Sequence, residues 1–252
     1  MNEREKPIAV FDSGAGGISV LKELVSLMPE ENYIYFGDSL NAPYGTKATE
    51  EVRALTIDNI SRLIAMGAKE AVVACNTATS AAVRNLREMY PSVPVIGLEP
   101  AIKPAALYAQ GGSVLVLATK LTLREKKLHT LVDKYKDMAD IILQPASELV
   151  EFAENGITSG DELDSYLNGI LSPYLDKVDA IVLGCTHFPL VRDAIQRAAG
   201  TIKLFDGGNG AAREAKRQLA QHNLLADGGK GSVTFMSSLD GKEELYKKLF
   251  NM

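Results

Sequence analysis

The sequence contains few of the residues that mark several protein classes. Among its 252 residues are two cysteines, three histidines and no tryptophan. Two widely separated cysteines in a chain of this length do not resemble the dense disulfide framework of a small secreted domain, so we expect free thiols in a reducing cytoplasm. The cysteines, histidines and carboxylates never occur at a recognised ligand spacing, and we therefore expect no metal site.

Basic clusters and long apolar runs are also missing. The net charge is -5, and the lysines and arginines are scattered. A nucleic acid or an anionic membrane requires a basic patch. The first residues, MNEREKP, lack the apolar core of a signal peptide. The longest uncharged run, 104–119, is interrupted by Gln110 and two glycines, so no membrane span is expected. These features favour a small-molecule substrate over nucleic acid or membrane.

Short apolar runs occur throughout the chain and alternate with segments of helical period. This alternation predicts parallel βαβ units and therefore an α/β protein. A hydrophobic content of 46% is enough for one large core or two smaller ones. The expected strands are 8–11, 33–36, 71–74, 93–96, 114–118, 141–143, 180–183 and 202–205.

Some helix starts have local signals. Thr122 with Glu125 and Ser159 with Glu162 fit capping boxes, in which a hydroxyl and a carboxylate satisfy first-turn amides. Pro189 suits an early helical turn, because that position needs no N–H donor.

Both cysteines lie in an internal repeat. The segments AVVACNTATSAAVRNL from Ala71 and AIVLGCTHFPLVRDAI from Ala180 each read as strand, cysteine, polar residues and helix. Duplicated α/β halves would each present ligand-binding loops at their strand ends. We expect both thiols at helix N-termini, which lower the pKa of a thiol from about 8.5. One such cysteine is more often a small buried hydrophobic residue, but two at equivalent positions indicate function.

Two further loops follow predicted strands. In FDSGAGG, from Phe11, the glycines allow amides to approach an anion, but Ser19 breaks the dinucleotide pattern and Asp12 would repel phosphate. The loop suits a zwitterion such as an amino acid, although Asp12 and Ser13 could instead cap a helix. The segment GDSLNAPYGTK, residues 37–47, is a lid or clamp candidate or a plain surface turn.

His187 follows Cys185 by two positions, where an imidazole could act as an acid or base beside the thiol. It could equally cap a helix. His129 and His222 lie in charged helical surroundings and are expected at the surface.

Taken together, FDSGAGG, APYG, ACNTATS, LATKLT and GCTHFP resemble the glutamate racemases of the cofactor-independent aspartate/glutamate racemase superfamily. The resemblance extends through essentially the whole chain. It implies two similar three-layer α/β lobes with mostly parallel sheets, related by pseudo-twofold symmetry, with the active site in the cleft between them. The lobes would comprise residues 1–98 plus 208–252 and residues 99–207.

The resemblance also implies the reaction. L-glutamate and D-glutamate would be interconverted without pyridoxal phosphate or any other cofactor, by two thiols acting on opposite faces of Cα. The product would supply peptidoglycan synthesis, and the protein would be a homodimer. Alternatives are an aspartate racemase, a lyase or hydrolase with one nucleophilic cysteine, and a non-catalytic amino-acid-binding module.

Residue roles follow from the same resemblance. Asp12 would assist Cys75, and His187 would assist Cys185. Glu154 fits the position of a further catalytic carboxylate, with Glu151 as the competing candidate, because ASELVEF replaces the Pro-rich segment of many relatives. The positions that match substrate contacts are Ser13, Pro43, Tyr44, Gly45, Asn76, Thr77, Thr119, Thr122 and Thr186.

Overall fold

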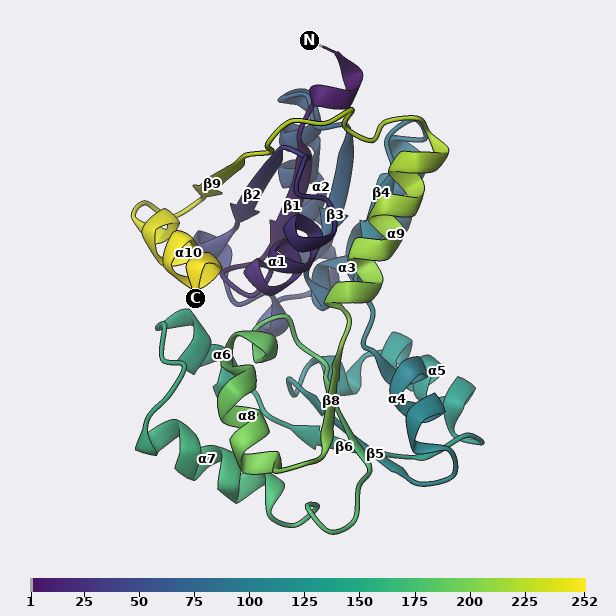
Figure 1. Ribbon diagram of the computed structural model, residues 1–252, viewed down its shortest axis with the longest axis vertical. Helices are drawn as coiled ribbons and strands as arrows, with labels where there is room; N and C mark the ends of the chain where they lie inside the picture. Colours follow the sequence, from purple (N-terminus) through teal and green to yellow (C-terminus); the bar gives the residue numbers. More distant parts are fainter. Residues whose placement is uncertain (1) are drawn as a thin grey trace. The chain divides into compact units, whose positions relative to one another are not determined.

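The computed structural model describes residues 2–252, which divide into two compact units (Figure 1). The first unit contains the chain up to Glu99 together with Gly208–Met252, and the second contains Pro100–Gly207. Each unit has a parallel sheet and packed helices, which confirms the predicted α/β class with two sheets. A pseudo-twofold relation between the lobes and a cleft shared by them stay predictions.

The sheet of the first unit has five parallel strands in the order β4-β3-β1-β2-β9. Every residue of β1 and β3 is buried, because both strands are central and have helices on both faces. Such strands are expected as continuous apolar runs rather than alternating ones. The strands are β1 (Ile8–Asp12), β2 (Tyr33–Gly37), β3 (Glu70–Val73), β4 (Val95–Gly97) and β9 (Val233–Ser237).

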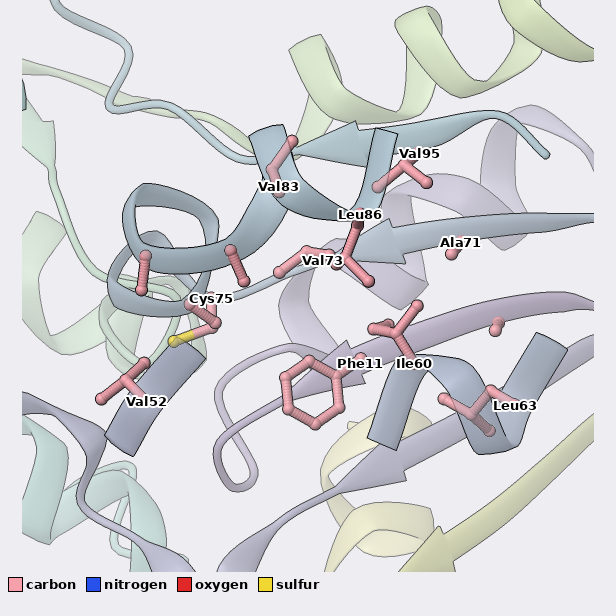
Figure 2. Packing of buried hydrophobic residues seen from close by; sticks show 14 of the residues in the cluster. Phe11, Val52, Ile60, Leu63, Ala71, Val73, Cys75, Val83, Leu86 and Val95 are labelled. Atoms are coloured by element: carbon pink, nitrogen blue, oxygen red, sulfur yellow. The ribbon is translucent and has the colours of Figure 1, made fainter. Parts of the chain in front are cut away.

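Helices α2 and α3 cover one face of this sheet. Their apolar side chains form a core cluster with Phe11 of β1 and Val73 of β3 (Figure 2). Helix α9 contacts β3 and packs against α1. The helices are α1 (Ile18–Leu27), α2 (Thr49–Ala65), α3 (Asn76–Met89), α9 (Gly208–Gln221) and α10 (Lys242–Asn251), with short 3-10 helices η1 (Glu3–Glu5), η2 (Ser39–Asn41) and η3 (Tyr44–Thr46).

The sheet of the second unit has four parallel strands in the order β6-β5-β7-β8. Alternate residues of its central strands enter two different cores: Leu115 and Ile181 belong to one, and Val114 and Val182 to the other. This alternation is the two-residue period of a strand covered on both faces. The strands are β5 (Ser113–Ala118), β6 (Asp140–Pro145), β7 (Ala180–Leu183) and β8 (Lys203–Asp206). The helices are α4 (Ile102–Ala109), α5 (Lys126–Tyr135), α6 (Glu148–Glu154), α7 (Asp161–Leu171) and α8 (Arg192–Ala199), with η4 (Thr122–Arg124) and η5 (Phe188–Val191).

The two sheets share a topology. The first four strands of each unit have the same order, β2-β1-β3-β4 and β6-β5-β7-β8. Equivalent hydrogen bonds hold the strand ends: Ala74 N donates to Phe11 O at 2.7 Å, and Gly184 N donates to Leu117 O at 2.8 Å. The repeat inferred around the cysteines is therefore a repeat of architecture.

The eight expected strands are present with end shifts of up to two residues. Strand β9 was not expected, because it is a partly exposed edge strand without a continuous apolar run. Both capping boxes are wrong. Thr122 begins η4 while Glu125 precedes α5, and Gly160 rather than Ser159 precedes α7, without a side-chain cap in either helix. Pro189 lies in the first turn of η5, as predicted.

Within residues 2–252, no helix combines the length and the apolar character needed to cross a membrane.

Candidate functional site

The strand order of each sheet places a ligand-binding position at its carboxyl edge. In the first unit, β1 lies between β2 and β3, so the connections that leave β1 and β3 run in opposite directions. In the second unit, β5 lies between β6 and β7 in the same way. Parallel α/β sheets bind ligands at such points, outside the carboxyl ends of the strands. The loops after β1, β3, β5 and β7 carry most of the candidate residues, and these form one cluster in each unit.

Cys75 lies at the N-terminus of α3. It is the N-cap residue of this 14-residue helix and is 6% exposed. Its Sγ is 3.6 Å from the hydroxyl of Ser13, which comes from the loop after β1. Figure 2 shows the Cys75 side chain at the end of the core cluster, with its sulfur toward Val52. The helix N-terminus that the sequence predicts at Cys75 is therefore present, and such a position stabilises a negative charge.

Asp12, the last residue of β1, is completely buried. Its Oδ1 accepts a hydrogen bond from Gly14 N at 2.8 Å, which closes the loop after the strand. Helix α1 begins later, with Gly17 as its N-cap, so Asp12 and Ser13 do not cap it. A Cβ on Gly17 would lie 2.6 Å from the Cβ of Asp12, so glycine is required for Asp12 to keep this place.

The loop after β2 contains a buried carboxylate that the sequence analysis missed. Asp38 is 1% exposed and accepts a hydrogen bond from the hydroxyl of Tyr44 at 2.6 Å. The amides of Asn41 and Asn59 donate to the same carboxylate. The sequence feature that could have identified Asp38 is its position directly after a strand, close to the APYG motif. The loop is thus organised around a buried side chain that accepts several hydrogen bonds.

Tyr44 has a strongly altered environment. Burial raises the pKa of its phenol, and the hydrogen bond to Asp38 and the negative charges of Asp38 and Cys75 raise it further. The hydroxyl therefore remains protonated and acts as a donor. Its neighbours in the motif are more accessible, since Pro43 is exposed and Gly45 is half-buried.

Asn76 and Thr77 form the first positions of α3, directly after Cys75, and both are partly exposed. Side chains at the first turn of a helix lie next to amides that have no partner within the helix, which is a favourable position for binding a carboxylate.

Cys185 differs from Cys75 in its backbone setting. The expectation of a helix N-terminus is wrong for this thiol, because η5 begins at Phe188 and α8 only at Arg192. Phe188 N and Leu190 N donate to carbonyls three residues earlier, and Pro189 has no N–H to donate. The segment therefore forms a 3-10 turn rather than an α-helix at this point.

The group beside Cys185 is the imidazole of His187 rather than a helix N-terminus. Its Nδ1 is 3.6 Å from Cys185 Sγ, and its Nε2 is 2.7 Å from Glu154 Oε1. Burial lowers the pKa of His187, but hydrogen bonds to Cys185 and Glu154 and the negative charges of both raise it well above its usual value. An imidazolium here donates one N–H to each partner. The imidazole does not cap η5.

The structure distinguishes the two candidate carboxylates. Glu154 ends α6 with a side chain that is 21% exposed and bonded to His187. Glu151 lies one turn earlier and is exposed. The geometry therefore supports Glu154 as the carboxylate that acts on the Cys185 cluster.

Three threonines complete this cluster at the strand ends. Thr119 follows β5, and its Oγ1 is 3.0 Å from Oγ1 of Thr122. Thr122 is buried, and its side chain faces Thr119 rather than a helix end. Thr186, between Cys185 and His187, is also buried.

The other two histidines lie at the surface. His129 and His222 are exposed, as predicted. In the part of the chain that the structure describes, no group of three or more histidines, cysteines and carboxylates could hold a metal ion. Both cysteines are free thiols.

Comparison with known proteins identifies similar sequences and folds. The family model described as Asp/Glu/Hydantoin racemase matches residues 11–215. A glutamate racemase of Clostridium botulinum is 47% identical, with 99% of this chain and 98% of that protein covered. Escherichia coli glutamate racemase, solved with L-glutamate and the activator UDP-MurNAc-ala, is similar with a TM-score of 0.85 at 32% identity, covering 98% and 94% of the two chains. The Thermus thermophilus glutamate racemase structure, with beta-chloro-D-alanine, gives 0.79 at 33% identity, covering 98% and 93%.

Proposed function

Because the chain belongs to the glutamate racemases of the Asp/Glu/Hydantoin racemase family, it is an isomerase acting on an amino acid, and we propose that it does so with two thiols, Cys75 and Cys185. The family membership confirms the resemblance seen in the sequence. The single observation that supports the two-thiol mechanism is the placement of the cysteines at equivalent strand ends of two units with the same topology. Inversion at one carbon requires an acid or base on each face, and a duplicated architecture supplies two of them.

The proposed reaction moves one proton off Cα and another onto it. One thiolate removes the Cα proton of L-glutamate, and the second cysteine, as a thiol, donates its S–H proton to the opposite face. In the reverse reaction the roles exchange. The balance is one proton taken and one delivered, so no cofactor or redox partner is required. A proton next to an ammonium and a carboxylate is only weakly acidic, and the developing carbanion needs fixed donors around the substrate carboxylate.

The two thiols have different support. The first turn of α3 stabilises the Cys75 thiolate, and Asp12 is the buried carboxylate proposed to assist this half. His187, held by Glu154, supports Cys185. Each half thus offers one group to stabilise the thiolate and one to help return the proton.

The substrate contacts are proposed from the same two clusters. Amides and side chains at the start of α3, together with the loop of Ser13, suit the α-carboxylate. The buried threonines of the second unit supply hydroxyl donors. The Escherichia coli relative was solved with L-glutamate, which supports the same substrate here. The D-glutamate formed would serve peptidoglycan synthesis in the cytoplasm, and a homodimer is the proposed assembly.

The first test is circular dichroism of the purified protein with L-glutamate in heavy water, without added pyridoxal phosphate. We expect the signal to decay to zero and the recovered glutamate to carry one deuterium at Cα by mass spectrometry. L-aspartate is the substrate control. Decay with aspartate alone would instead make the protein an aspartate racemase, and no decay with either would overturn the proposal.

Single variants test the pairing of the thiols. We expect Cys75→Ser and Cys185→Ser each to lower kcat at least about a hundredfold, since each removes one required acid or base, while glutamate binding measured by calorimetry largely survives. A lyase or hydrolase with one nucleophilic cysteine would tolerate one of the two changes. Full racemase activity in either variant would contradict the role of that thiol.

A further inference from the structure

The carboxylate of Asp38 links three segments of the first unit. Asp38 directly follows β2, and its backbone N–H donates to Asp12 O at 2.9 Å. Its Oδ2 accepts from Tyr44 in η3 at 2.6 Å and from Asn59 in α2 at 3.2 Å. The Asn41 amide is 3.0 Å from Oδ1 and 3.1 Å from Oδ2. The strand end, the loop 38–47 and helix α2 therefore meet at Asp38, the strand end through its backbone N–H and the other two through its carboxylate.

These partners are all neutral donors. None of the three side chains that bind the Asp38 carboxylate is a cation, and the residue is 1% exposed. A buried charge without a counterion is costly unless several hydrogen bonds hold it. A loop that only reverses the chain direction does not need a buried carboxylate. The three neutral donors therefore indicate that Asp38 serves as a hydrogen-bond acceptor.

The shortest of these hydrogen bonds comes from Tyr44, which lies in the loop proposed to bind substrate. The Tyr44 ring is 1% exposed and packs against Phe11, with ring centres 6.3 Å apart. It belongs to the same core cluster as Cys75. Packing fixes the ring plane, but the direction of the hydroxyl proton depends on an acceptor. Asp38 is that acceptor, so the phenol oxygen presents its lone pairs, and not its proton, to the remaining surroundings.

We propose that Asp38 is a positioning residue of the racemase, acting through Tyr44 to hold the loop 43–45 in its substrate-binding conformation. This rests on the proposed function, because it assigns a role within the same site. Asp38 does not exchange a proton with substrate. It fixes the orientation of the Tyr44 hydroxyl and joins the loop to the strand end that carries Asp12.

A double-mutant cycle tests this role. Asp38→Asn keeps the shape of the side chain but leaves one acceptor oxygen for three donors, and Tyr44→Phe removes the donor while keeping the ring. We expect each variant to raise KM for glutamate about tenfold with a much smaller change in kcat, because a hydrogen bond to a charged group is lost. The double variant should have nearly the same KM as Asp38→Asn alone, since both changes remove one interaction.

The matched control is Tyr33→Phe. Tyr33 is another tyrosine that is 1% exposed in the first unit, and its hydroxyl donates to the carbonyls of Leu24 and Met28. We expect Tyr33→Phe to lower stability without raising KM, which separates positioning from a general loss of packing. If Asp38→Asn does not fold, Asn59→Ala removes a donor to the same oxygen from α2 and completes the cycle with Tyr44→Phe.

The outcomes separate the two proposals. The role of Asp38 alone is overturned if the wild-type protein racemises glutamate and Asp38→Asn leaves KM unchanged. It is also overturned if the effects of Asp38→Asn and Tyr44→Phe on KM multiply in the double variant. A wild-type protein that racemises neither glutamate nor aspartate overturns the proposed function and the role of Asp38 with it.

Discussion

His187 Nε2 lies 2.7 Å from Glu154 Oε1, while the other ring nitrogen of His187 faces Cys185. This contact joins the end of α6 to the loop after β7. It makes the protonation of the imidazole depend on a carboxylate that is distant in the sequence. Burial lowers the pKa of His187, but the hydrogen bond to Cys185 and then the one to Glu154 raise it above its usual value. The second thiol is thus supported by a chain of side chains, whereas Cys75 is supported by a helix.

The contact predicts a shift in the pH profile. Glu154→Gln removes a negative charge and a hydrogen bond beside His187, so the pKa of the imidazole falls. Because the imidazolium is lost as pH rises through its folded pKa, the alkaline limb of kcat/KM should move to lower pH. The measurement is racemase activity from pH 6 to pH 10.

Glu151→Gln is the control for this shift, because Glu151 lies on the same helix but is exposed. Its profile should match the wild-type profile. An unchanged profile in Glu154→Gln together with a shifted profile in Glu151→Gln would assign the role to the competing carboxylate.

Because different residues are proposed to assist the two thiols, we expect isotope effects that depend on which enantiomer is the substrate. Asp12→Asn weakens the Cys75 half, and His187→Asn weakens the Cys185 half, so we expect each to lower kcat, by roughly a hundredfold. Each change makes proton transfer at its own thiol more rate-limiting. With glutamate deuterated at Cα, the primary isotope effect should increase for one enantiomer in Asp12→Asn and for the other in His187→Asn. The same enantiomer affected in both variants would contradict the assignment of one residue to each thiol.

The buried side chain of Glu70 predicts that the folded protein loses stability as the pH rises. The side chain is completely buried at the start of β3, and neither of its oxygens has a hydrogen-bond partner among residues 2–252. Burial, reinforced by the charge of Glu31, raises its pKa to about 9, despite Lys69. An unfolded glutamate ionises near pH 4.3. The folded state therefore holds an extra proton between these values, and stability falls as pH rises.

Glu70→Gln removes this dependence. Urea unfolding should show the variant gaining on the wild-type protein by up to about 1.4 kcal/mol for each pH unit between pH 5 and pH 9. The control is Glu50→Gln, which changes an exposed glutamate at the start of α2. Parallel stability curves for Glu70→Gln and the wild-type protein would show that Glu70 ionises normally in the folded state.

We expect a large loss of stability when the buried ion pair of Lys69 and Glu31 is broken. Its ammonium is buried and paired with Glu31, and it also donates to the carbonyls of Arg4 and Leu224. Lys69→Met leaves Glu31 buried without its counterion, and we expect a loss of about 3–5 kcal/mol in the free energy of unfolding.

Arg84→Met is the matched control for this pair. Arg84 pairs with Glu88 on α3, and its side chain is 92% exposed, so its loss should change stability little. Chemical denaturation measures both variants. Equal effects would show that burial does not set the strength of the Lys69 pair.

Local patterns in the sequence were sufficient for most of the architecture. Strands β1, β3 and β7 are buried throughout, and a buried parallel strand needs β-branched and aliphatic residues on both faces. That requirement is visible in a few consecutive letters. The repeat around Cys75 and Cys185 predicted two similar sheets for the same reason. The edge strand β9 escaped prediction, because none of its residues is fully buried and it has no continuous apolar run.

The sequence alone determined which loops hold the candidate site residues, since Asp12, Cys75, Cys185 and His187 each follow or adjoin a predicted strand end. Only the tertiary structure decided which distant groups lie in contact with them. The choice of Glu154 over Glu151 depends on where α6 packs, and the role of Asp38 depends on donors from three different elements. The absence of a helix at Cys185 follows from 3-10 bonding around Pro189. Periodicity is a property of neighbours along the chain, whereas hydrogen bonds between distant segments exist only after the core has formed.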